Sequence, residues 1–152
     1  MNISNAVVIA HAPRSLRRSR IAANRHWLSI LEENPAQVAR DPLLGHLFGN
    51  MVVLDFAKNL FNQGKLANLY FYRDSNGLEA DLLFQQGRNL IPMEIKSSST
   101  YKPELLKGLQ RICGLSPLMK KAFLVYAGEP FTFSNGLSAV RFDQLGSVLG
   151  ED

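Results

Sequence analysis

The sequence predicts an α/β protein in which helices pack against a mixed β-sheet. Residues 45–64 carry an apolar residue at every fourth position, which is typical of a helix packed on one side. Residues 79–84 and 90–96 are short strand-like segments separated by turn residues, which is typical of a hairpin. After residue 45 the expected order is helix, three strands, helix and strand, not a regular alternation of strands and helices.

The composition is that of one globular domain. The chain has 152 residues, of which 46% are hydrophobic and 20% are charged, and this excludes a disordered protein. Its apolar runs are too short to span a bilayer, so we expect no membrane contact. The single cysteine, Cys113, excludes an internal disulfide and a thiolate metal cluster. We therefore expect a cytoplasmic protein in a reducing compartment.

The charge is distributed unevenly along the chain. Residues 1–26 hold five arginines and no acidic residue, so they carry +5 of a formal net charge of +4, and the remainder carries −1. Such a segment could contact phosphate or an anionic surface, or it could be a solvated arm. We predict a basic leader over residues 1–26 and a single domain over residues 27–152.

The segment before residue 45 predicts two elements. Residues 6–9 are apolar and predict a short strand. An arginine-rich stretch after Pro13 predicts a helix, which Asn34 and Pro35 end because the residue before a proline avoids the helical conformation.

A long helix and a group of strands form the expected core. Gly64 is placed to end the helix, whose apolar face comprises Phe48, Val52, Phe56 and Leu60. The pair Asn76 and Gly77 suits the positive φ angles of a tight hairpin. The expected strands are residues 69–72, 79–84 and 90–96.

The last third of the chain predicts a second helix and further strands. Pro103 lies at the expected first turn of a helix that runs to Cys113. A strand over residues 121–127 follows, and then a hairpin formed by residues 131–133 and 137–141. A small helix over residues 142–149 completes the chain.

Alternation along the strands brings charged side chains together. Glu94 and Lys96 share one face of the strand over residues 90–96, because successive side chains point to opposite faces. Asp81 is expected to point away from the apolar residues of its own strand, which are Ala80, Leu82 and Phe84. If the two strands pair as a hairpin, Asp81 approaches Glu94.

Two neighbouring carboxylates repel each other unless a cation lies between them. Mg²⁺ takes hard oxygen ligands and keeps several waters, so Asp81, Glu94 and a backbone carbonyl form a sufficient set. A bound cation activates water and stabilises charge on a phosphate. Lys96 would then orient that water or neutralise the phosphate. A half-exposed hairpin with charged side chains would give the same pattern, so both interpretations stay open.

Three further polar residues are candidates for contacts with a substrate phosphate. Ser97 and Ser98 follow Lys96 and could use their hydroxyl and amide groups, or they could form only a polar loop before the helix. Arg73 could contact phosphate, or it could pair with Asp74 for structural reasons.

Four segments resemble a known family. They are residues 41–48 (DPLLGHLF), 68–74 (NLYFYRD), 77–83 (GLEADLL) and 91–98 (IPMEIKSS). In this order, over roughly two-thirds of the chain, they resemble the C-terminal domain of many bacterial and archaeal AAA-type ATPases of unassigned function. That family resembles the PD-(D/E)XK nuclease superfamily, whose core order is helix, three strands, helix and strand. The resemblance implies that Asp81, Glu94 and Lys96 are the catalytic residues, with Asp81 and Glu94 as ligands of Mg²⁺.

Two features depart from the family pattern. The family usually has a glutamate after the phenylalanine of its first core helix, where this chain has Gly49 after Phe48. The sequence also lacks the phosphate-binding loop of an ATPase, so no ATP binding is expected and the chain looks like a detached module.

Two classes of function follow. The first is Mg²⁺-dependent hydrolysis of phosphodiester bonds in nucleic acid, impaired or lost because Gly49 replaces the first-helix acid. The second is a catalytically silent module, left from a larger ATPase, that binds nucleic acid or a protein or forms a homo-oligomer.

Overall fold

The computed structural model describes residues 9–10, 44–133 and 135–146. The helix expected after Pro13 and the boundary expected between residues 26 and 27 lie outside these ranges. The strand expected over residues 6–9 lies outside them except for Ile9.

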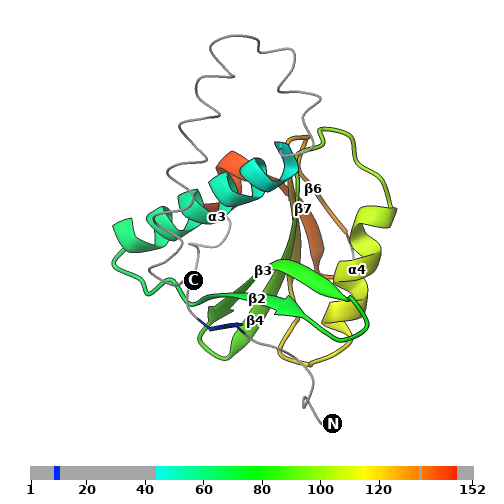
Figure 1. Cartoon of the computed structure of the whole chain (residues 1–152), viewed down its shortest axis with the longest axis horizontal. Coiled ribbons are helices and arrows are strands. Elements are labelled where there is room, and N and C mark those ends of the chain that lie inside the picture. Colours follow the sequence, from blue (N-terminus) through cyan, green and yellow to red (C-terminus); the bar gives the residue numbers. More distant parts are fainter. Residues whose placement is uncertain (1–8, 11–43, 134, 147–152) are drawn as a thin grey trace.

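The described residues form a seven-stranded mixed sheet with one helix on each face (Figure 1). The expected order of helix, three strands, helix and strand is confirmed. In chain order the elements are β1 (Ile9–Ala10), α3 (Leu44–Asn62), β2 (Leu69–Arg73), β3 (Glu79–Gln86), β4 (Asn89–Lys96), α4 (Glu104–Cys113), β5 (Ala122–Tyr126), β6 (Phe131–Thr132), β7 (Leu137–Arg141) and the 3₁₀-helix η1 (Phe142–Gln144). Residues 147–149 of the last expected helix lie outside the described ranges.

The strand order across the sheet is β1-β2-β3-β4-β5-β7-β6, which places β4 at the centre. The strands from β1 to β4 pair antiparallel, whereas β4 with β5 and β5 with β7 pair parallel. Helix α4 forms the crossover that a parallel neighbour of β4 requires. The hairpin expected after residue 130 is confirmed as the antiparallel pair β6 and β7.

Helix α3 packs on one face of the sheet and crosses several strands. Phe48, in its first half, lies edge-on to Phe142 at a centroid distance of 5.4 Å, and η1 begins at Phe142 directly after β7. Phe56 lies edge-on to Phe84 of β3 at 5.2 Å. Gly64 has a φ of 69°, and the chain leaves the helix there as expected. None of the described helices is long and apolar enough to cross a membrane.

Helix α4 packs on the other face. Its buried residues Leu106, Leu109 and Ile112 recur every third residue and so form one side of the helix. Leu106 and Leu109 belong to the same apolar cluster as Leu124 of β5 and Ala139 of β7. The sheet therefore separates two apolar layers, one under each helix.

Strand β3 contains a β-bulge. Tyr70 of β2 pairs with Leu83, and Tyr72 pairs with Ala80, so β3 uses one residue more than β2 over the same stretch. An extra residue of this kind interrupts the alternation of side chains between the two faces. The bulge includes Asp81.

The bulge divides β3 between the two apolar layers. Ala80 packs with Ile112 of α4, whereas Leu82 and Phe84 belong to the cluster under α3. The expectation that Ala80, Leu82 and Phe84 share one face is therefore wrong. It assumed strict alternation, which the extra residue breaks between Ala80 and Leu82.

Candidate active site

Strands β3 and β4 part at Asp81. Their antiparallel pairing extends to Leu82 and Met93 and does not include Asp81. Beyond that pair a side chain replaces the backbone acceptor, because Asp81 Oδ2 accepts a hydrogen bond from the backbone N–H of Ile95 at 2.8 Å. This bond fixes the Asp81 carboxylate beside the central strand.

Lys96 lies between the two expected carboxylates. Its Nζ is 2.6 Å from Glu94 Oε1 and 3.9 Å from Asp81 Oδ2. The structure therefore brings together the three residues that the sequence singled out. The Glu94 side chain is 17% exposed and that of Lys96 is 39% exposed, so the cluster is half-buried but reachable from solvent.

The surroundings shift the pKa values of two members. Burial raises the pKa of Glu94, and the charge of Asp81 adds to this rise more than the ammonium of Lys96 offsets it. Burial acts to lower the pKa of Lys96, but its hydrogen bond to Glu94 and the negative charges around it raise the pKa overall. Lys96 is therefore a firmly charged cation in the cluster.

The chemistry of these donors fits Mg²⁺. Two carboxylates provide hard oxygen ligands, and the ammonium of Lys96 shows that the space between them already accommodates a positive charge. Within the described ranges no group of three or more histidine, cysteine, aspartate or glutamate residues is arranged to hold a metal ion. Asp81 and Glu94 would thus hold the ion with water in its other positions, as Mg²⁺ commonly is held.

Gly49 does not lie beside this cluster. It follows Phe48, whose ring contacts Phe142 after β7, so it lies at the end of α3 that is far along the sheet from β3. Glu94 pairs with Leu124, which lies in the apolar layer on the opposite face of the sheet from α3. The missing first-helix acid therefore leaves the arrangement of Asp81, Glu94 and Lys96 intact.

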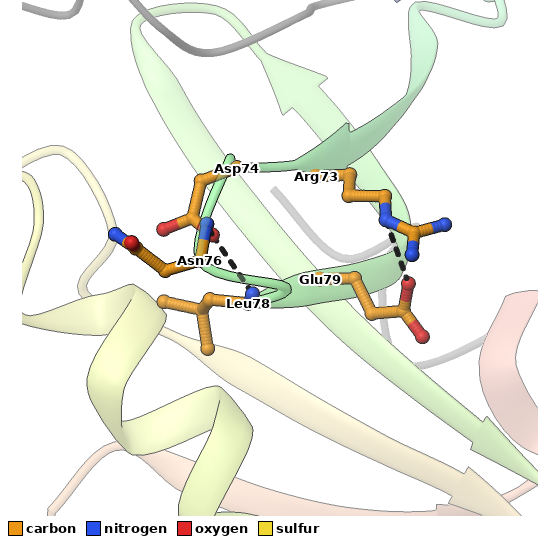
Figure 2. A network of polar contacts seen from close by, with 5 residues as sticks. All are labelled: Arg73, Asp74, Asn76, Leu78 and Glu79. Atoms are coloured by element: carbon orange, nitrogen blue, oxygen red, sulfur yellow. Dashed lines mark hydrogen bonds and ion pairs between the residues drawn. The ribbon is translucent and has the colours of Figure 1, made fainter.

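Arg73 pairs with a residue other than the one expected. Its Nε is 3.8 Å from Glu79 Oε2, and Figure 2 shows the two side chains pointing toward each other across the β2–β3 hairpin. Asp74 instead stabilises the turn, because its Oδ1 accepts hydrogen bonds from the backbone N–H groups of Asn76 and Leu78. The suggested structural pair of Arg73 with Asp74 is therefore wrong.

Glu79 is a residue of this region that the sequence analysis missed. Its negative charge contributes to raising the pKa of both Glu94 and Lys96, which places it within electrostatic reach of the cluster. It stands two residues before Asp81 in β3. That spacing was visible in the sequence, but the pattern of the PD-(D/E)XK superfamily does not direct attention to it.

Ser97 and Ser98 begin the loop that follows Lys96. Ser98 Oγ donates to the carbonyl of Thr100 and accepts from its backbone N–H, both at 3.0 Å, so this hydroxyl shapes the loop. The Ser98 carbonyl accepts a hydrogen bond from the backbone N–H of Ala127 at 3.1 Å, which joins this loop to the one after β5. The two serines thus lie at the carboxyl ends of the parallel strands, next to Lys96.

The comparison with protein families gives one match. The model of the domain of unknown function DUF4143 matches residues 44–145, which is more than half of the chain. This family is known in association with AAA-type ATPases, so that part of the sequence-based resemblance is confirmed. No curated protein matches the chain.

Proposed function

The chain belongs to the DUF4143 family, and on this premise we propose that it is a nuclease-like protein that hydrolyses phosphodiester bonds of nucleic acid with Mg²⁺. The observation that carries the proposal is the position of Lys96 between the carboxylates of Asp81 and Glu94. The order from α3 to β5 supports it, because a PD-(D/E)XK core has the same order of elements. Fold order alone would be a weak argument, since folds do not determine functions.

Each member of the cluster has a separate role in this proposal. Asp81 and Glu94 hold the ion, and Asp81 is already positioned by the N–H of Ile95. When bound, Mg²⁺ supplies an activated water and stabilises the negative charge that builds on phosphate. Lys96 places a compact positive charge beside the phosphate.

The remaining candidates lie where they could contact the substrate backbone. Ser97 and Ser98 are adjacent to Lys96 at the end of β4, where main-chain and hydroxyl groups can meet a phosphate. Arg73 reaches the same region only through its exposed pair with Glu79. Its contact with phosphate therefore requires that this weak pair open.

We expect wild-type protein to cleave DNA or RNA with Mg²⁺ or Mn²⁺, and Lys96→Ala to be slower by about a hundredfold. The loss follows from removal of the only ammonium placed between Asp81 and Glu94 in the described structure. Initial rates on labelled single- and double-stranded substrates measure it.

The matched control for this assay is Lys120→Ala, which removes an exposed lysine just before β5. It should retain the wild-type rate. Absence of cleavage by the wild-type protein with every substrate and both metals would refute the proposal, as would full activity of Lys96→Ala.

An exposed apolar surface on α3 supports a second candidate function, homo-oligomerisation. Met51, Leu54 and Phe61 are 45%, 54% and 64% exposed and lie on one side of the helix. The opposite side carries the buried residues Val52 and Phe56. An apolar surface of this kind marks an interaction site more often than it marks nothing.

We expect the wild-type chain to self-associate as its concentration rises, and the double variant Leu54→Glu with Phe61→Glu to stay monomeric. Two buried charges at an interface would cost more than the contacts contribute. Multi-angle light scattering over a range of concentrations measures the mass. A monomeric wild-type protein throughout that range would rule out this candidate.

A further inference from the structure

Glu79 lies opposite Lys96 in the two strands that carry the cluster. The pairing of Leu82 with Met93 continues, three residues further along, to Glu79 on β3 and Lys96 on β4. The backbone pairing ends before this point, but the hydrogen bond from Ile95 to Asp81 keeps the two strands side by side. The electrostatic effect of Glu79 on Lys96 agrees with this placement.

The present partner of Glu79 binds it only loosely. Its carboxylate is 3.8 Å from Arg73, and the two side chains are 48% and 63% exposed. An exposed ion pair of this length contributes about 0–1 kcal/mol. Glu79 can therefore accept a second cation at little cost.

Lys96 occupies the position that a divalent cation would need. Its Nζ is 2.6 Å from Glu94 Oε1, so that oxygen cannot bind a metal until the ammonium moves. The lysine side chain is long and partly exposed, so it can swing without disturbing the strand. The displaced ammonium then needs another acid, because a neighbouring divalent cation repels it.

We propose that Glu79 receives the ammonium group of Lys96 when a divalent cation takes its place between Asp81 and Glu94. This inference rests on the proposed function and makes Glu79 a positioning residue that acts through Lys96. The formal charges balance only with Glu79: three carboxylates carry −3, and Lys96 with a divalent cation carries +3. Without Glu79 the same arrangement carries +1.

The test is a double-mutant cycle on Mn²⁺ binding, followed by the electron paramagnetic resonance signal of free Mn²⁺. The four proteins are the full-length wild type, Glu79→Gln, Lys96→Ala and the double variant. Glu79→Gln should weaken Mn²⁺ binding about tenfold when Lys96 is present and by less than about twofold when Lys96 is alanine. Glu79→Asp, which keeps the charge, should restore most of the affinity.

Two results would overturn the inference. An equal loss in both backgrounds would mean that Glu79 attracts the cation directly, and no loss in either would mean that it has no part in binding. Glu104→Gln is the matched control, because this exposed glutamate at the start of α4 is absent from the charges that act on Glu94 and Lys96.

The same experiment separates this inference from the proposed function. If the wild type binds Mn²⁺ but the cycle shows no coupling, the role of Glu79 is refuted and the proposed function stands. If the wild type binds no Mn²⁺, both are refuted. Urea unfolding of Glu79→Gln should match the wild type, since the side chain is half-exposed, and this keeps a binding effect distinct from a folding effect.

Discussion

Asp81→Asn is expected to lower Mg²⁺-dependent hydrolysis by about a hundredfold or more while leaving the free energy of unfolding almost unchanged. Asparagine keeps an oxygen that can accept the hydrogen bond from Ile95, which Asp81 Oδ2 now accepts at 2.8 Å. It removes the negative charge that would hold the ion together with Glu94. Initial rates and urea unfolding of the same preparation separate the two effects.

Asp81→Ala is the informative companion to this variant. It removes both the charge and the acceptor, so it should lose activity to the same extent and in addition be about 1–3 kcal/mol less stable. Asp55→Asn, on the exposed side of α3, is the control and should change neither quantity. Wild-type hydrolysis by Asp81→Asn would show that the carboxylate serves only the backbone of β4.

Leu109→Ala is expected to lower the free energy of unfolding by about 3 kcal/mol. Leu109 is fully buried between α4 and the sheet, where it packs in the same cluster as Leu124 and Ala139. Removing its side chain loses apolar burial and leaves a cavity that the parallel strands cannot readily close. Urea unfolding, fitted to two states, measures the change.

Leu54→Ala is the matched comparison, because it makes the same substitution inside a helix and so cancels the difference in helix propensity. Leu54 is 54% exposed, and we expect a change below about 0.5 kcal/mol. A cost for Leu54 close to that for Leu109 would show that the side chain is covered in the folded protein. Equal small costs would contradict the assignment of α4 to a core layer.

The helices and the hairpin could be predicted because their signals are local. The four-residue repeat of apolar residues defined α3, and Gly77 has a positive φ of 77° as its place in the turn predicts. Alternation in β4 separated Glu94 and Lys96 from Met93 and Ile95 correctly, because that strand is regular. The candidate site was therefore located from two strands and one turn.

Features that depend on distant contacts could not be predicted. The bulge at Asp81 arises from the pairing of β3 with β2, which no local pattern in β3 reveals. The parallel pairing of β7 with β5 likewise depends on how the sheet is completed. Glu79 was missed because its relation to Lys96 appears only when the register between β3 and β4 is known.

The bulge also limits how the length of β3 can vary. Residues before it serve the layer under α4, and residues after it serve the layer under α3. Losing one residue near Asp81 would restore plain alternation and turn either Ala80 or Leu82 toward the wrong layer. Insertions and deletions between relatives should therefore gather in the turns on either side of β3, and the spacing from Ala80 to Phe84 should be constant.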